Sequence, residues 1–207
     1  MTGKTAGFNF ELKIFLVSSN GEGIKSPGIL RQSLGKLAIV QRKLSSKQKG
    51  SKRRVKARLD VARLHKKIGN QRKDWHYKLA NKIIDEYDEI YFEDLNIDGM
   101  KRIWGRKVSD LGFSSFLTIL EQKSLQKDVK FIKIGRFEPT SKICNFCGFK
   151  KTDLKLEDRT WECSICGKMH DRDLNAAKNI KTVGSSTARG ECVKLIDLIV
   201  GLVSNTC

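Results

Sequence analysis

The sequence has no apolar run long enough to span a bilayer and no N-terminal signal peptide, so it predicts neither a membrane-spanning nor a secreted protein. Cysteines are few: of six in 207 residues, four form two close pairs, leaving only Cys192 and Cys207. This usage argues against a disulfide framework and suits a reducing compartment, so we expect a cytoplasmic protein. No internal repeat is visible, and the length allows one good core with a small satellite.

Acidic residues are scarce in one long segment. Residues 31–82 contain 18 Lys and Arg but only Asp60 and Asp74, so this segment carries +16 of the formal net charge of +18. A solvated helix normally interleaves Glu with its Lys, so the imbalance predicts a polyanionic partner. The segment lacks a broad apolar face of bulky residues, which favours nucleic acid over a membrane surface as that partner.

The basic segment supplies the candidate nucleic-acid contacts. We expect phosphate binding and a nucleoid-associated location for the protein. The candidate residues are Lys52, Arg53, Arg54, Lys56, Arg58, Arg63, Lys66, Lys67, Arg72 and Lys73.

The N-terminal third predicts a hairpin followed by two helices. An alternating apolar run predicts a strand over 7–17, and Asn20-Gly21 is a strong hairpin signal before a second strand near 23–25. Helical spacing then extends to residue 45, and a Ser/Lys/Gly-rich break precedes a long helix over about 52–85. An apolar stripe runs along that helix. We expect Trp75 on this stripe to pack in the core rather than to stack on a nucleic-acid base. The stripe is Val55, Leu59, Ala62, Trp75, Leu79 and Ile83.

The next segment adds strands at both ends of a third helix. Residues 89–95 predict a short strand ending in acidic residues, and a loop containing Gly99, Trp104 and Gly105 follows. Residues 110–127 predict an amphipathic helix, and 129–135 one more strand. This order of elements predicts a mixed α/β sheet with helices packed on it.

Two C-x2-C pairs, Cys144/Cys147 and Cys163/Cys166, are separated by fifteen residues. Two such turns complete a closed, tetrahedral four-thiolate site for a structural zinc ion. The segment between them, through Leu154, Glu157 and Trp161, predicts a hairpin whose core is too small to fold without the metal. The alternative is a loop without metal, either reduced or disulfide-bonded. Four thiolates leave no open position for a water, so catalysis has to lie elsewhere.

Three acidic or polar positions could converge at the carboxyl ends of strands. They are Asn9 in the first strand, Glu93 at the end of a later strand, and the pair Asp171 and Asp173 before the last helix. Three carboxylates so placed would hold two Mg²⁺ ions and clamp a phosphodiester. The alternative is that these acids are helix caps or surface groups.

The order of several motifs makes a family recognisable. The chain from about residue 7 to 181 closely resembles the C-terminal half of TnpB, the OrfB-type protein of bacterial and archaeal insertion sequences, which is related to type V CRISPR effectors. The resemblance rests on the four cysteines and on Gln41-Arg42-Lys43-Leu44-Ser45, Lys49-Gly50-Ser51-Lys52, Leu64-His65-Lys66-Lys67-Ile68, Asn70-Gln71-Arg72-Lys73-Asp74, Phe92-Glu93-Asp94-Leu95-Asn96 and Asp171-Arg172-Asp173-Leu174-Asn175-Ala176-Ala177-Lys178-Asn179-Ile180.

The resemblance implies an RNase H-like (RuvC-type) fold, a mixed sheet with flanking helices and an inserted zinc ribbon. It also implies RNA-guided cleavage of DNA by a Mg²⁺-dependent acidic triad, with DNA and guide RNA as partners. The expected division is a nuclease domain over 1–138 with its basic helical segment at 31–85, a zinc ribbon at 139–169, the last nuclease helix at 170–190, and an apolar tail at 191–207. The tail is too short to span a bilayer and suggests either a strand covering the sheet or a decaying reading frame.

By position, Glu93 matches the second acid of the family and Asp173 the third, with Asp171 beside it. The first acid belongs in a motif Gly-x-Asp-x-Gly-x-Lys, where this chain has Asn9, with Glu11 at the second glycine. An amide carries no charge, so the site loses an anion needed to hold two dications. Glu11 lies on the same face of the predicted strand but about 7 Å further along, which makes it a poor substitute.

The sequence therefore predicts a transposon-encoded, TnpB-like protein that binds DNA and RNA, is shorter than its family, and is impaired as a nuclease by Asn9. One rival is an active RuvC-like DNA endonuclease in which neighbouring acids compensate. The other is a nuclease-dead regulator or a gene relic. The sequence predicts no oligomeric state.

Overall fold

The computed structural model describes residues 2–136, 138–155, 157–190 and 195–200. Its central sheet has the strand order β3-β2-β1-β4-β5. Strand β1 pairs antiparallel with β2 and parallel with β4, and β4 pairs parallel with β5, which confirms the predicted mixed sheet. The strands are β1 Thr5–Phe10, β2 Leu16–Ser18, β3 Gly23–Ile24, β4 Glu89–Glu93 and β5 Lys130–Ile134.

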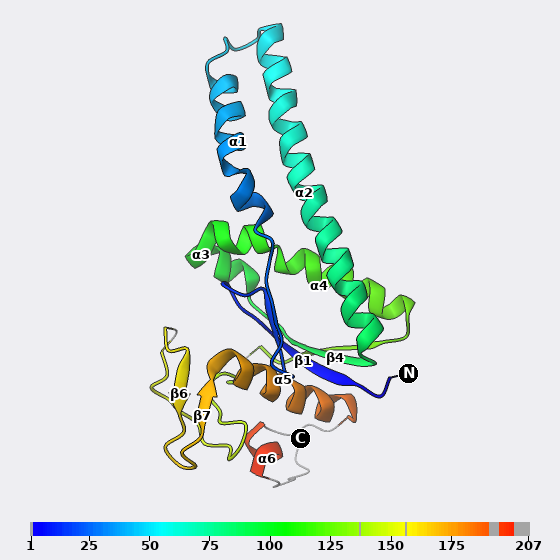
Figure 1. Cartoon of the computed structure of the whole chain (residues 1–207), viewed down its shortest axis with the longest axis vertical. Helices are drawn as coiled ribbons and strands as arrows, with labels where there is room; N and C mark the ends of the chain where they lie inside the picture. The colour runs from blue at the N-terminus through cyan, green and yellow to red at the C-terminus, as the bar shows by residue number, and fades with distance from the viewer. Residues whose placement is uncertain (1, 137, 156, 191–194, 201–207) are drawn as a thin grey trace.

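Helices cover both faces of this sheet (Figure 1). Helices α2 and α4 pack against one face in the main core, and α5 and α6 pack against the other. Two short strands, β6 and β7, pair antiparallel in a separate sheet. The bounds are α1 Ile29–Ser45, α2 Lys52–Glu86, α3 Ile97–Leu111, α4 Phe113–Gln126, β6 Thr160–Glu162, β7 Met169–Asp171, α5 Arg172–Ala188 and α6 Leu195–Val200.

The predicted single strand over 7–17 is wrong, because the chain turns between β1 and β2. Glu11 stabilises this turn: its Oε2 accepts the backbone N–H of Lys13 at 2.7 Å and that of Ile14. A charged side chain that binds its own backbone competes with continued strand pairing. The predicted hairpin at Asn20-Gly21 is confirmed, with Gly21 at a φ of 91° between β2 and β3.

Side chains of β1 alternate between the two faces and thereby position the site. Phe8 and Phe10 enter the core under α2 and α4, whereas Gly7 and Asn9 face α5. A Cβ atom on Gly7 would lie 2.3 Å from the backbone oxygen of Ala177, so α5 crosses β1 in direct backbone contact. This crossing brings the N-terminal turn of α5 beside Asn9.

Helix α1 and the N-terminal half of α2 lie side by side and project away from the sheet (Figure 1). We call this projection, residues 29–68, the arm. The predicted helices are confirmed, but the predicted stripe is wrong at its start: Val55 and Leu59 are 47% and 48% exposed, and Ala62 is exposed. Leu79 and Ile83, near the sheet, are buried as expected.

The expected loop around Gly99 and Gly105 is helix α3, bent at Gly105, where φ is 33°. The Asn96 side chain caps its start by accepting the N–H of Gly99 at 3.0 Å. Asp110, near its end, accepts the N–H of Leu30 at 3.0 Å and therefore caps the arm helix α1 across 80 positions of sequence. This contact ties the base of the arm to α3.

The C-terminal tail differs from the sheet-covering strand that was one expectation. Residues 195–200 form helix α6, and Leu195 is 1% exposed in a cluster with Tyr91 and Ile180 on the α5 side of the sheet. The rest of the apolar tail, with Cys192 and Cys207, lies outside the described residues.

Trp75 packs against the main core as predicted, with its ring 4.7 Å from that of Phe15. The adjacent His76 is completely buried and its Nε2–H donates to the carbonyl oxygen of Leu111 at 3.0 Å. Its Nδ1 has no hydrogen-bond partner among the described atoms. Burial, which outweighs the Leu111 contact, lowers the pKa of His76 to about 4.

The buried His76 predicts acid sensitivity of the fold. Between pH 6.5 and about 4 the unfolded chain binds a proton that the folded chain does not, so stability falls as the pH falls. The loss is about 3 kcal/mol over this window. The variant His76→Gln keeps a hydrogen-bond donor for Leu111 but has no group that titrates in this window. Denaturant titration at several pH values should therefore show that its free energy of unfolding does not fall by this amount. An identical pH dependence in both proteins would contradict the assignment.

Candidate functional site

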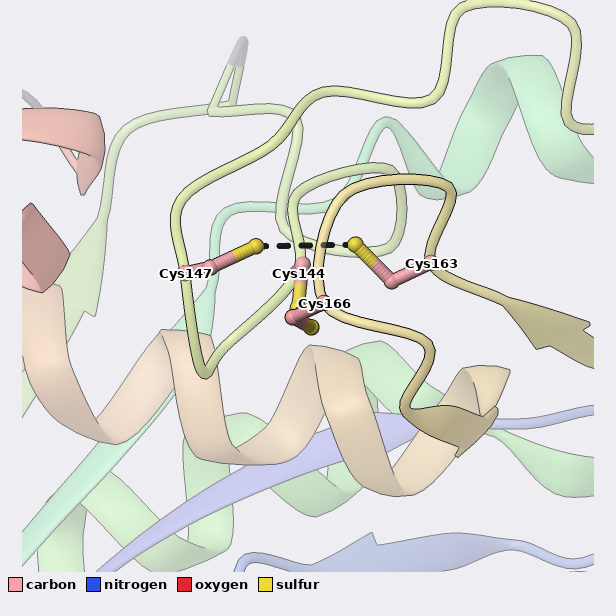
Figure 2. Close-up of side chains that lie close together, drawn as sticks. All are labelled: Cys144, Cys147, Cys163 and Cys166. Carbon is pink, nitrogen blue, oxygen red and sulfur yellow. Dashed lines mark hydrogen bonds between the residues drawn. The ribbon is translucent and has the colours of Figure 1, made fainter.

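The four paired cysteines form one cluster (Figure 2). Their sulfur atoms all lie within 4.8 Å of one another. Cys144 and Cys166 are 3.8 Å apart, and Cys147 and Cys163 are 3.5 Å apart. Thiolates at the corners of a zinc tetrahedron with bonds of about 2.3 Å lie about 3.8 Å apart, so the cluster fits a four-thiolate metal site.

Both cysteine pairs sit on the same kind of turn. The N–H of Cys144 donates to Phe149, and the N–H of Gly148 returns to the Cys144 carbonyl at 3.0 Å. Cys163 and Gly167 repeat this pattern at the second pair. Gly148 and Gly167 have φ values of 77° and 66°, a conformation that glycine adopts at no steric cost. The sequence therefore builds two matching turns that point their thiols at one another.

The hairpin predicted within the ribbon is wrong in its pairing. Strand β6, which contains Trp161, pairs with β7 beyond the second cysteine pair, and Leu154 is buried beside Trp161 without belonging to a strand. Strand β7 contains His170, whose Nε2 lies 3.0 Å from the sulfur of Cys144. With the proton on Nε2, His170 donates to this thiolate and packs against Trp161 at 4.6 Å. Sequence reasoning did not assign His170 a role.

A hydrogen bond to a metal-bound thiolate predicts a measurable effect on metal affinity. His170→Phe keeps a ring beside Trp161 but removes the donor to Cys144. We expect zinc affinity to fall about 10- to 100-fold, as for other groups that support a metal ligand. Competition with a chromophoric chelator measures the change. Unaltered affinity would show that His170 serves only to pack the ribbon.

The predicted acidic positions line one cavity of about 620 Å³. Asn9 comes from β1, Glu93 from the end of the neighbouring parallel strand β4, and Asp173 from the first turn of α5. The Asn9 Nδ2 donates to Asp173 Oδ1 at 3.2 Å. Three segments far apart in the sequence therefore meet at the carboxyl ends of β1 and β4, where sheet topology places ligand sites.

Asp171, the fourth predicted position, does not line this cavity. Its carboxylate accepts the N–H of Leu174 at 2.8 Å and caps the start of α5. This is the helix-cap alternative that the sequence left open for the acidic residues.

Two carboxyl groups of the cavity have raised pKa values. Burial is the main cause for Glu93, whose pKa rises to about 7, with a smaller contribution from the charge of Asp94. For Asp173, burial and then the charge of Glu11 raise the pKa, while Arg159 and Arg172 oppose the rise. Buried, mutually repelling carboxylates of this kind occur where a cation is bound, and they also occur in structural ion-pair networks.

Arg159, just before β6, lines this cavity together with Arg172. Its Nη1 lies 2.8 Å from Glu11 Oε1 and 3.0 Å from Asp173 Oδ2. Glu11 is 6% exposed and follows β1 directly. The sequence analysis assigned Arg159 no role. No local signal could have placed its contact with Glu11, because that contact joins positions 11 and 159 of the sequence.

The side chains present do not fit a pair of magnesium ions. Asn9 contributes a neutral amide, whose nitrogen faces Asp173. Both oxygens of Asp173 are engaged, one by Asn9 and one by Arg159. Among the described residues, only the cysteines bring three or more His, Cys, Asp or Glu ligand atoms within 4.8 Å of one another. Mg²⁺ needs oxygen ligands in near-octahedral geometry, and the described carboxylates that line this cavity do not converge closely enough to supply three of them.

Eight of the ten predicted basic residues are exposed, mostly along the arm. The other two are committed to the fold. Arg54 donates to the carbonyls of Leu44 and Lys47 at the end of α1, and Arg72 donates to that of Ser109 at 2.7 Å. Near the tip of the arm, a groove of about 350 Å³ is lined by Val40, Lys43, Lys47, Arg53, Lys56, Ala57 and Asp60.

A family model described as "Probable transposase" (OrfB/IS605) matches residues 1–104, which is half of the chain. The chain belongs to the OrfB/IS605 transposase family. A second model, "Cas12f1-like, TNB domain", matches residues 113–180, which contain the four cysteines and Asp173. The resemblance to TnpB that the sequence motifs indicated is thereby confirmed.

Curated relatives carry names consistent with this OrfB/IS605 membership. A "Putative RNA-guided DNA endonuclease" of Streptomyces pristinaespiralis is 34% identical over 196 residues, 93% of this chain and 48% of that protein. "TnpB-like protein L79" of Acanthamoeba polyphaga mimivirus is 32% identical over 142 residues, 65% of this chain and 27% of that protein. The chain thus spans about half the length of the first relative and less of the second.

A solved structure of the Cas12f1-sgRNA-target DNA complex shares the fold of this OrfB/IS605 chain. The match has a TM-score of 0.61 at 22% identity and covers 85% of this chain and 49% of the other. The predicted mixed α/β sheet with flanking helices is confirmed, and the cysteine cluster beside it fits the predicted zinc ribbon. No helix in the described part of the chain is both long and apolar enough to cross a membrane.

Proposed function

We propose that this chain is a TnpB-type protein that binds DNA and guide RNA, derives from an RNA-guided DNA endonuclease, and is impaired in cleavage at Asn9. The observation that carries the first part is the arm. It belongs to the segment that holds +16 of the net charge of +18, and most of its basic side chains are exposed. A projecting helix pair with exposed cations suits phosphate binding independent of base sequence.

The cysteine cluster of the ribbon suits a structural metal ion rather than a catalytic one. We propose one structural Zn²⁺ on Cys144, Cys147, Cys163 and Cys166, because the sulfur spacing fits a closed tetrahedron. We propose the same division of the chain as the sequence suggested: a nuclease-like domain over 1–138, the ribbon over 139–169 and the closing helix over 170–190. Hydrogen bonds from Asn175 and Asn179 to the Ile143 carbonyl, each 2.7 Å, join the ribbon to α5 and support its placement beside the cavity.

The proposed impairment of cleavage rests on the cavity that contains Asn9. Asn9, Glu93 and Asp173 occupy the positions of the family's acidic triad, but the first lacks a charge and donates a hydrogen bond to the third. Two phosphodiester-clamping metal ions require anions that this arrangement does not offer. We therefore propose Glu93 and Asp173 as remnants of a catalytic site.

Binding of labelled RNA and duplex DNA at several salt concentrations tests the proposed function. We expect affinity to fall at least tenfold between about 50 and 200 mM salt, because several phosphate contacts release counterions. RNA that co-purifies with the protein would support a guide-binding role. Absence of binding to either nucleic acid at low salt would refute it.

An active endonuclease is the second candidate, because Glu11 places a carboxylate near Asp173. Incubation of supercoiled plasmid with the protein and Mg²⁺ separates the two functions. We expect no nicking above the level of a Glu93→Gln control. Nicking that this control loses would establish the active enzyme.

A further inference from the structure

A second cavity, of about 670 Å³, lies on the ribbon. All three residues of strand β6, Thr160, Trp161 and Glu162, line it, and Cys163 connects it to the cysteine cluster. It shares no lining residue with the cavity that contains Asn9 or with the groove on the arm. This ribbon cavity is therefore separate from both sites described above.

Strand β6 has a neighbour on one edge only, because it pairs with β7 in a two-stranded sheet. Two backbone hydrogen bonds fix which residues face that neighbour. The N–H of Cys163 donates to the carbonyl of Lys168 at 3.0 Å, and the N–H of Arg172 donates to that of Arg159 at 2.8 Å. Residues 159, 161 and 163 therefore direct their backbone groups toward β7, in agreement with the observed register.

Thr160 and Glu162 direct their N–H and C=O groups to the opposite edge of β6, because successive residues of a strand alternate in this direction. Neither N–H has a hydrogen-bond acceptor within the described part of the chain, and both side chains are exposed. An open strand edge of this kind is a template for another extended backbone. Both residues line the ribbon cavity, so the space beside this edge is free.

The ribbon cavity also borders an unsatisfied donor. Trp161 is only 4% exposed and packs against the ring of His170 at 4.6 Å. Its indole Nε1–H is buried and has no hydrogen-bond partner among the described atoms. Most buried polar groups are hydrogen-bonded, and an exception calls for an explanation. An acceptor in the adjacent cavity, such as a peptide carbonyl, would provide one.

The charge of the ribbon cavity is opposite to that of the protein. Asp153, Asp158 and Glu162 line it with a single lysine, Lys151, whereas the whole chain carries +18. Lys151 lies 3.7 Å from Asp153, and the other two carboxylates have no ion-pair partner within the described residues. Three carboxylates repel a phosphate and attract a cation. They do not converge on one metal ion, because among the described residues only the cysteines form such a cluster.

We propose that the open edge of β6 binds an extended peptide segment that bears lysine or arginine side chains. The peptide backbone adds a third strand by pairing with Thr160 and Glu162, and its cations lie against Asp158 and Glu162. The backbone edge supplies affinity, and the carboxylates select a basic segment over an acidic one. This site is additional to the proposed nucleic-acid binding and does not depend on it.

Amide NMR spectra of the zinc-bound, full-length chain test this site, with the blocked peptide Lys-Thr-Lys-Thr-Lys as the probe. We expect the backbone amides of Thr160 and Glu162 and the indole N–H of Trp161 to shift on titration. The Kd should be on the order of 1 mM, since a few exposed hydrogen bonds and ion pairs contribute. The peptide Glu-Thr-Glu-Thr-Glu should leave these signals in place.

Four variants separate the contributions of the edge and of the charges. Thr160→Pro removes an outward N–H but no bond to β7, and should weaken peptide binding about tenfold. Glu162→Gln should weaken it about threefold, and Lys151→Gln, which removes the competing cation, should strengthen it about threefold. Glu22→Gln removes an exposed acid far from the ribbon in sequence and should change nothing.

Zinc content near one per chain shows that each variant retains a folded ribbon. If Thr160→Pro loses its zinc, the opposite effects of Glu162→Gln and Lys151→Gln decide. Unchanged affinity in these variants, or equal binding of the acidic peptide, would overturn the proposal. So would the same shifts on addition of an oligothymidylate, which would indicate a nucleic-acid site. Shifts that depend on protein concentration without peptide would instead identify a second copy of the chain as the occupant, and would also overturn it.

Discussion

Replacing Arg53 and Lys56 by Glu is expected to weaken binding of RNA and DNA about 100-fold at about 0.15 M salt, alike for all sequences. Both residues are exposed and line the groove at the tip of the arm. The substitution removes two cations and adds two anions where phosphates would lie. The salt dependence should also become shallower by about two counterions. Filter binding or fluorescence anisotropy over a salt series measures both effects.

The matched control is Lys4→Glu with Lys25→Glu, the same change of charge at two exposed lysines outside the arm. It should reduce affinity far less. Arg54 is left intact, because its side chain donates to carbonyls at the end of α1 and its loss would disturb the arm itself. Equal losses in the arm variant and the control would mean that only overall charge matters. A loss confined to one sequence would contradict phosphate binding by the arm.

Removing the metal from the cysteine cluster is expected to unfold the ribbon. The cluster's small core contains little besides Leu154 and Trp161, and a structural zinc ion supplies on the order of 10 kcal/mol of folding free energy in domains of this size. Cys163→Ser should therefore bind no zinc by elemental analysis and become susceptible to proteolysis between residues 139 and 171. The arm helices should remain folded, because they pack against each other and α1 contacts α3, far from the ribbon in sequence.

Cys192→Ser is the control for this experiment and should retain one zinc per chain. Zinc content near one in Cys163→Ser, or a ribbon that resists protease after chelation, would contradict a metal-dependent ribbon. Because Arg159 directly precedes β6, which leads into Cys163, loss of zinc should also release its contacts with Glu11 and Asp173.

Local patterns predicted most of the elements. The long basic helix, the turn at Asn20-Gly21 and the strand ending at Glu93 all follow from periodicity and turn chemistry, which act within a few residues. Helix α3 was missed because Gly99 and Gly105 are typical of loops. The helix forms because Asn96 caps its start, and it bends at Gly105, where the backbone leaves helical geometry.

Tertiary contacts account for the remaining errors. Val55 and Leu59 follow helical spacing, but nothing on the described part of α1 buries them. The family motifs placed Asn9, Glu93 and Asp173 in one cavity, whereas the roles of Glu11, Arg159 and His170 depend on side-chain contacts that spacing does not encode. Asp171 shows the reverse case: the motif placed it beside the third acid, and in the structure its side chain caps α5.

Metal titration of Asn9→Asp tests the central claim most directly, namely that this chain keeps the site of a nuclease but has lost metal capture at Asn9. The substitution is nearly isosteric and restores an anion between Glu93 and Asp173. Calorimetry with Mn²⁺ should show binding in Asn9→Asp at least tenfold tighter than in wild type, and the gain should disappear in Asn9→Asp/Glu93→Gln. Equal, weak binding in all three proteins would mean that these residues do not form one metal site and would contradict the account.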